Sequence, residues 1–337
     1  MSITAATPAV EVAAGVHQIA VPTPFIVGRV NAYLFQGEPL TLLDTGPNTA
    51  TSLDELERSL ATIGVRIEDI GRVIISHQHV DHVGLAGIIQ RRSGSEIAMI
   101  EQLAPVIADW AAASDRDDVI GGALMRASGV TPEVLAAMSS VSRAYRAFGA
   151  SVQCTQPFSD GSQIEIGDRT YHVMLKPGHS PSDTVFHSRE DGLLIGADHL
   201  LEHVSSNPLI SAPLDLAADL SVRPRPLPEY LKNLRSTAEL DVSLVLPGHG
   251  KPFSDHRAVI EKRFKMHERR AAKLLDALKT EPQTAREMAY GLWGDLAATQ
   301  TFLTLSEVVG HMDLLLDERA VIELPPDSNG TVRYSRA

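Results

Sequence analysis

The sequence has one cysteine, few aromatic residues and no long apolar run. A lone cysteine cannot form an internal disulfide, which excludes a small disulfide-stapled secreted domain. No stretch approaches the roughly 20 consecutive apolar residues that a membrane-spanning helix needs. The N-terminal segment MSITAATPAVEVAAG also lacks the basic start and apolar core of a secretory signal. These absences predict a cytoplasmic protein without a membrane segment.

Basic residues are outnumbered, with 30 Lys and Arg against 42 Asp and Glu and a formal net charge of −12. The resulting field repels polyphosphates on average, so nucleic acid is a disfavoured partner and a small molecule is the expected substrate. The apolar fraction of 44% over 337 residues excludes a disordered chain. A chain of this length predicts roughly two domains.

The hydrophobic pattern changes three times along the chain. Residues 12–44 alternate short apolar runs with Gly and Pro, which indicates strands joined by tight turns. Helical spacing over 49–63 is followed by the apolar strands RVIIS and EIAMI. Residues 102–150 form an Ala- and Met-rich helical insertion, after which strands resume. We therefore predict a layered α/β catalytic domain over 1–254 and a smaller domain over 255–337, which begins with a long charged helix.

The strongest chemical signal is the hexapeptide HQHVDH at 77–82. Side chains two positions apart on extended backbone point the same way, so His77 and His79 can hold one metal ion. Asp81 and His82 follow where the chain turns into a helix and can face a second ion. The motif occurs directly after a buried strand, where open α/β sheets place their ligands.

Four further polar residues directly follow predicted strands: His179 in KPGHS, Asp198 in GADHL, His249 in PGHG and Asp44 in LLDTG. Imidazoles and carboxylates gathered at one face suit zinc, with manganese and iron as alternatives. We predict that Asp44 orients a ligand imidazole, although Asp is also common in turns for its local hydrogen bonds.

The ordered motifs DTG, HxHxDH, PGHS, GAD and PGHG, over about residues 12–253, resemble the metallo-β-lactamase superfamily. The pattern is most similar to its glyoxalase II-like and endoribonuclease-like thioesterase branches. The resemblance implies a four-layer αββα sandwich with two divalent metal ions at one edge. It assigns His77, His79 and His179 to the first ion, Asp81, His82 and His249 to the second, and Asp198 to both. The tail 255–337 resembles the winged-helix domain of one branch.

The function expected from this resemblance is hydrolysis of an activated acyl bond, in a thioester, lactone or other ester, by a metal-bridging hydroxide. Asp81 is the predicted catalytic residue, which orients the water and accepts its proton. Asp rather than Cys or Ser at position 198 argues against antibiotic hydrolysis as the main activity. The alternatives are a phosphodiesterase on single-stranded RNA, favoured by the basic run at 262–273, and a mononuclear iron persulfide dioxygenase.

Two histidines near Asp198 and the C-terminal tail carry further predictions. His199 and His203 follow Asp198 closely and are candidates to line the substrate pocket. The tail carries an aliphatic stripe that must be buried, which favours packing against the catalytic domain or a second subunit in a homodimer.

Overall fold

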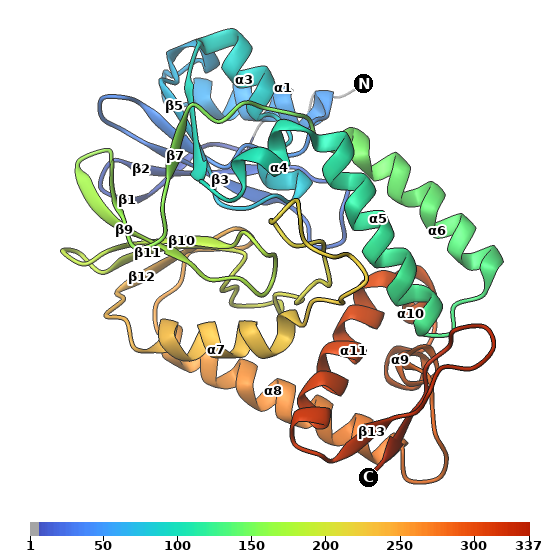
Figure 1. Cartoon of the computed structure of the whole chain (residues 1–337). Coiled ribbons are helices and arrows are strands. Elements are labelled where there is room, and N and C mark those ends of the chain that lie inside the picture. The colour runs from blue at the N-terminus through green and yellow to red at the C-terminus, as the bar shows by residue number, and fades with distance from the viewer. Residues whose placement is uncertain (1–6) are drawn as a thin grey trace.

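The computed structural model describes residues 7–337 as two β-sheets packed face to face, with helices on their outer surfaces and a helical region at one end (Figure 1). The first sheet has seven strands in sequence order: β1 (Val10–Ala13), β2 (Val16–Val21), β3 (Val30–Phe35), β4 (Thr41–Leu43), β5 (Arg72–Ile75), β6 (Glu96–Ile100) and β7 (Gln156–Phe158). The strands β1 to β4 are antiparallel, whereas β4 to β7 are parallel. The mixed sheet agrees with the predicted layered α/β fold.

The second sheet has five strands in the order β12, β11, β10, β9, β8. Their bounds are β8 (Gln163–Ile166), β9 (Arg169–Leu175), β10 (Thr184–Ser188), β11 (Leu193–Ala197) and β12 (Leu244–Pro247). Only β11 and β12 pair in parallel. Both strands are almost completely buried, because one face meets the first sheet and the other meets helices.

Helices cover the outer face of each sheet (Figure 1). The first sheet is covered by α1 (Ala50–Ala61) and α3 (Ala86–Ser93), and the second by α7 (Pro226–Ala238) and α8 (His256–Ala277). Thr49 caps α1 by accepting a hydrogen bond from the Ser52 amide at 3.0 Å, which confirms the predicted helix start. The short elements η1 (Ile67–Asp69) and α2 (Val80–Val83) flank β5. The arrangement is therefore four layers.

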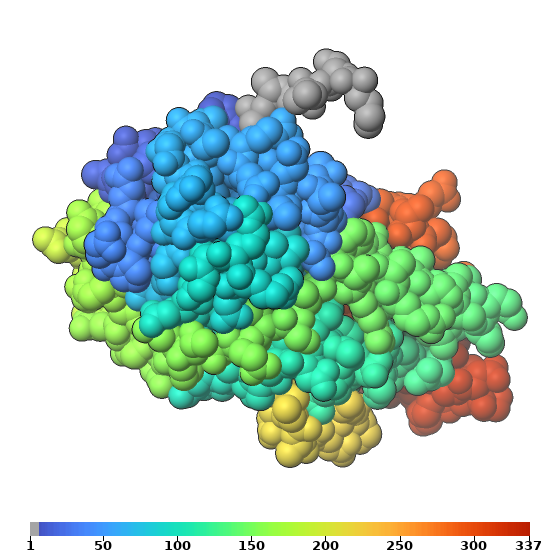
Figure 2. Space-filling view, turned by 90° about the horizontal axis from the view of Figure 1, so that it is seen from above, coloured from blue at the N-terminus to red at the C-terminus, as the bar shows by residue number. Residues whose placement is uncertain are grey.

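The insertion predicted at 102–150 is helical, as expected. It contains α4 (Ala104–Ala108), α5 (Trp110–Ala127), α6 (Pro132–Tyr145) and η2 (Arg146–Phe148). Viewed from above, its green segments extend from the N-terminal half toward the C-terminal part of the chain (Figure 2). Ile120 and Leu124 of α5 share one apolar cluster with Leu274 of α8 and Val308 of α11 (Thr301–Asp317). The insertion and the tail therefore pack together.

The tail continues after α8 with α9 (Ala285–Trp293), α10 (Leu296–Thr299), α11, and the two-stranded sheet β13 (Val321–Glu323) and β14 (Tyr334–Arg336). Most of the aliphatic stripe on α11 is buried, as predicted, whereas Leu303 is 36% exposed. Leu227 of α7 packs against Gly310 of α11 so closely that a Cβ there would lie 2.9 Å from the Leu227 Cβ. The tail thus packs on the catalytic part, and the domain boundary at 254/255 and the winged-helix assignment stay predictions.

A buried polar cluster fastens α8 to α11. His311 donates from Nδ1 to the Glu307 carbonyl at 2.7 Å, so its Nε2 accepts the hydrogen of His267 Nδ1 at 3.2 Å. Arg270 pairs with the Glu307 carboxylate. Burial, helped by His311 and the neighbouring Arg270 guanidinium, lowers the pKa of His267 to about 3. His267 is therefore neutral in the folded protein at neutral pH.

No helix among the described residues combines the length and apolarity needed to cross a membrane.

Breaking the Arg223–Asp313 pair tests how the tail is attached. Arg223 Nη1 lies 2.8 Å from Oδ2 of Asp313, whose side chain is only 2% exposed. Arg223→Met should lower the free energy of unfolding by about 3 kcal/mol, because it leaves a buried carboxylate short of its main partner. Arg333→Met breaks an exposed pair with Glu287 and should lower the free energy of unfolding by at most about 1 kcal/mol. Urea titration of both variants measures the difference. Equal losses would contradict a buried anchoring role.

His267 should make stability depend on pH. Its pKa of about 3 in the folded state lies below the unfolded value of about 6.5, so the unfolded chain takes up the proton first as pH falls. The free energy of unfolding therefore does not depend on His267 protonation above pH 6.5, and below that pH it decreases by about 1.4 kcal/mol per pH unit. Urea unfolding at pH 6.5 and 5.0, with a chelator present to remove metal ions, measures this effect. Between these pH values the free energy of unfolding should fall less in His267→Gln than in the wild type, whereas the exposed His203→Gln should match the wild type.

Candidate metal centre

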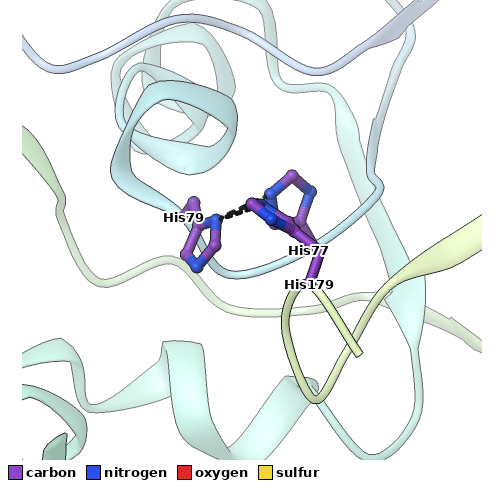
Figure 3. A group of neighbouring side chains, drawn as sticks. All are labelled: His77, His79 and His179. Carbon is purple, nitrogen blue, oxygen red and sulfur yellow. Dashed lines mark hydrogen bonds between the residues drawn. The ribbon is translucent and has the colours of Figure 1, made fainter. Parts of the chain in front are cut away.

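The first group of ligands is formed by His77, His79 and His179. His77 and His79 lie in the loop between β5 and α2, and His179 lies in the loop after β9. The three rings face one another (Figure 3), with His77 Nε2 at 3.0 Å and His179 Nε2 at 2.9 Å from His79 Nδ1. The structure brings together the three residues that the sequence resemblance assigned to one ion.

The second group is formed by Asp81, His82 and His249. Asp81 and His82 lie in α2, and His249 follows β12. The Asp81 carboxylate lies 3.9 Å from His82 Nε2 and 3.4 Å from His249 Nε2. Each of the three residues can turn one ligand atom toward a common point. The predicted second set is therefore also gathered.

The carboxylate of Asp198 lies between the two groups. Its Oδ2 is 3.4 Å from the Nε2 atoms of both His179 and His249, and its Oδ1 is 3.5 Å from Nε2 of His82. The chain reaches this position through Ala197, whose φ of 41° is unusual for a residue with a side chain. A Cβ at Gly248 would overlap Asp198 Oδ1, so glycine is required beside it.

Buried atoms without partners show that these residues fit a metal ion. Neither His82 Nε2 nor Asp198 Oδ1 has a hydrogen-bond partner, although both are buried. Buried polar atoms are almost always paired, so two unpaired ligand atoms that face each other are suited to share a cation. Five imidazoles with two carboxylates are a donor set for zinc or a similar divalent ion. These groups could therefore hold divalent metal ions, and the donor set does not select among zinc, manganese and iron.

The remaining ring nitrogens of three ligand imidazoles, those of His82, His179 and His249, are each bonded to a second group. Asp44, which is 1% exposed, accepts hydrogen bonds from His82 Nδ1 at 2.8 Å and from the Ser76 hydroxyl at 2.7 Å. The backbone carbonyls of Arg29 and Asn207 accept from His249 Nδ1 at 2.8 Å and His179 Nδ1 at 3.0 Å. These bonds fix which nitrogen faces the metal.

Asp44 thus lies where its predicted role requires. Sequence reasoning missed Ser76, Arg29 and Asn207. Ser76 could have been noticed as the neighbour of the HxHxDH motif. Arg29 and Asn207 contribute only backbone carbonyls, for which side-chain identity gives no signal.

Burial and neighbouring charges shift the pKa values of the ligand histidines in opposite directions in the two groups. Burial is the main cause that lowers the pKa of His79 to about 3 and keeps that of His77 well below its usual range. Burial alone would also lower the pKa of His249, but the carboxylates of Asp198 and Asp81 outweigh it and raise the value to about 10. Asp44 and Asp198 similarly raise the pKa of His82. Metal binding at the second group must therefore release protons, and affinity there should increase with pH.

The two pocket candidates lie in different surroundings. His199 is fully buried, and its Nε2 lies 2.9 Å from the Thr237 hydroxyl. The His203 side chain is 73% exposed and pairs with Glu202. Their contact with a substrate stays a prediction.

A separate group of possible ligands, His267, Glu307 and His311, is the cluster that joins α8 to α11. Its carboxylate is already paired with Arg270, and its imidazoles are bonded to each other. One ring nitrogen, His267 Nε2, is buried without a partner, but the Arg270 guanidinium beside the carboxylate disfavours a second cation there.

The family model of the metallo-beta-lactamase superfamily matches residues 26–249, which contain all seven predicted ligands. The chain belongs to the metallo-beta-lactamase superfamily and is a metal-dependent hydrolase.

Among curated proteins, the chain is 36% identical over 305 residues to the "Probable metallo-hydrolase YqjP" of Bacillus subtilis (strain 168), a match that covers 90% of this chain and 92% of that protein. Two solved structures resemble it over nearly their whole length. One is a metallo-beta-lactamase family protein from Thermus thermophilus, at 26% identity with a TM-score of 0.81, covering 97% of this chain and 100% of that one. The other is a beta-lactamase domain protein from Burkholderia ambifaria, at 26% identity with a TM-score of 0.80, covering 100% and 97%.

Asp44→Asn should weaken metal binding at the second group without unfolding the protein. The substitution keeps the shape of the side chain but removes the charge that orients His82 and the acceptor shared with Ser76. Loss of such a partner costs about 10- to 100-fold in metal affinity. Competition with a chromogenic zinc chelator measures the change. Asp168→Asn, at an exposed position, is the control and should leave the zinc affinity of both ligand groups unchanged. Wild-type zinc affinity in Asp44→Asn would contradict the orienting role.

Proposed function

We propose that this chain is a dinuclear metal-dependent hydrolase of activated acyl bonds, with thioesters as the first substrate class and lactones or other esters next. The observation that carries the proposal is the position of Asp198, whose carboxylate lies within 3.5 Å of ligand nitrogens from both groups. A residue placed in this way can contact two ions at once. Divalent ions held by these residues would lower the pKa of a bound water from about 15.7 to near 7 and so supply hydroxide at neutral pH.

Asp81 is the residue proposed to hold and move the proton. Burial alone would raise the pKa of its carboxyl, but the charge of His82 and the hydrogen bond with His249 outweigh burial and lower it. The carboxylate is therefore ionised and can accept a proton from water. Its side chain is 10% exposed, more than the fully buried His82 beside it. Asp81 can thus orient a water molecule toward an acyl carbon.

An apolar loop beside the metal centre supports a hydrophobic acyl group. The loop between β2 and β3 carries Ile26, which is 81% exposed, and Val27, which is 40% exposed. The carbonyl of Arg29 on the same loop holds the ligand His249. Phe25 packs against Tyr145 and Phe148 of the insertion, with ring centroids 5.6 and 5.7 Å away. The insertion therefore supports a loop that offers apolar surface near the reacting centre.

Two observations weigh against the alternatives. In the basic run 262–273, Arg263 bonds to backbone carbonyls and Arg270 pairs with Glu307, so two of its cations serve the protein itself. This weakens the case for RNA as the substrate. The complete second group, Asp81, His82 and His249, favours two ions over the single iron of a persulfide dioxygenase. The glyoxalase II-like branch, a winged-helix tail over 255–337 and a homodimer remain proposals.

A substrate panel with a matched variant tests this function. The zinc-loaded protein should hydrolyse acyl thioesters, and lactones more slowly, and chelation should abolish both. Asp81→Asn should lower kcat on thioesters by about 10²- to 10⁴-fold through loss of the proton acceptor. The exposed Asp168→Asn serves as the control and should keep full activity.

The result that would overturn the proposal is cleavage of single-stranded RNA, with a steep dependence on salt and no acyl hydrolysis. One bound iron per chain with oxygen consumption would favour the dioxygenase instead.

A further inference from the structure

Residues 201–210, here called the ligand loop, hold one metal ligand by both its ring and its backbone. The loop begins three residues after Asp198. The Asn207 carbonyl accepts the hydrogen of His179 Nδ1 at 3.0 Å, and the Leu209 amide donates to the His179 carbonyl at 3.2 Å. The position of the ligand loop therefore sets the direction in which His179 points its Nε2.

The ligand loop contains no helix or strand, so it depends on contacts from elsewhere. Arg263 of α8 donates from Nη2 to the carbonyls of Leu201, Glu202 and Val204, at 2.8, 2.9 and 2.6 Å. The Asn207 side chain donates from Nδ2 to the Leu303 carbonyl of α11 at 3.0 Å. Both supporting helices lie in the C-terminal part of the chain.

These two helices are joined to each other by buried contacts. The buried cluster of His267, His311 and Glu307 joins α8 to α11. The Arg263 guanidinium is partly buried, and burial lowers its pKa. The three carbonyls that accept hydrogen bonds from its Nη2 belong to residues outside any helix or strand. A side chain with this many acceptors fixes the path of the loop.

We propose that Arg263 and Asn207 are positioning residues for the first metal site, and that the C-terminal helices set its metal affinity through the ligand loop. The inference rests on the proposed dinuclear site but not on the acyl substrate. Arg263 acts at the start of the loop, and Asn207 carries both the contact to α11 and the carbonyl that orients His179. The tail thereby has a defined role at the metal centre.

Stepwise zinc binding to the full-length metal-free protein tests this proposal. Arg263→Ala should weaken one of the two sites by about 10- to 100-fold, the loss typical when support of a ligand is removed. Cobalt substitution should show altered ligand-field absorption for that site alone. Arg263→Lys should recover part of the affinity, because an ammonium group can still donate to several carbonyls.

Arg257→Ala is the matched control. Arg257 also lies on α8 and donates to two backbone carbonyls, of Ala238 at 2.9 Å and Leu240 at 2.7 Å, but these do not belong to the ligand loop. It should leave both zinc affinities and the cobalt spectrum unchanged. An equal loss in Arg257→Ala would show a general effect of weakening α8 and would overturn the proposal.

Asn207→Asp provides a second variant that creates no cavity, in case Arg263→Ala does not fold. A carboxylate facing the Leu303 carbonyl cannot donate, so the same site should lose affinity. Wild-type zinc affinity and cobalt absorption in folded Asn207→Asp would refute the role of the loop. If zinc affinity falls in these variants but the wild type hydrolyses no acyl substrate, the positioning role stands and the proposed acyl chemistry fails.

Discussion

The burial of the Asp198 carboxylate among imidazoles is the constraint on which the rest of the site depends. An isolated ionised carboxylate in the protein interior is strongly unfavourable, and only opposite charge and hydrogen bonds make it tolerable. Burial would raise the pKa of Asp198, but His249 and His82 outweigh burial and lower it well below its usual value. The same attraction raises the pKa values of the two histidines. The Asp198 carboxylate and the imidazoles of His82 and His249 thus stabilise one another's charged forms at the place where divalent ions fit.

The double-sheet architecture makes this gathering possible. Asp44 and His77 follow β4 and β5, which are parallel neighbours in the first sheet. Asp198 and His249 follow β11 and β12, the parallel pair of the second sheet. Parallel neighbours end at the same edge, so each sheet delivers its ligands to one side. Packing the sheets face to face brings the two edges together, which no single sheet could achieve.

The C-terminal helices are part of the same construction. Their apolar residues share a cluster with the insertion, and α11 meets α7 at Gly310. The insertion in turn contacts the loop between β2 and β3 through Phe25, and that loop supports His249. The insertion and the tail therefore each contact a loop that holds a metal ligand. Most ligands follow strands of the two sheets, whereas the orientation of His179 and His249 depends on carbonyls of loops that contribute no ligand.

The sequence by itself determined the residue types and the strand ends that carry the site. The HxHxDH motif after an apolar run supplied four of the seven predicted ligands, and strand ends with a nearby glycine supplied His179, Asp198 and His249. The alternating pattern indicated a layered α/β fold. Only the tertiary structure decided how these ligands are held. The carbonyls of Arg29 and Asn207 and the support from Arg263 depend on where the backbone passes in space, and a backbone carbonyl leaves no mark on residue identity.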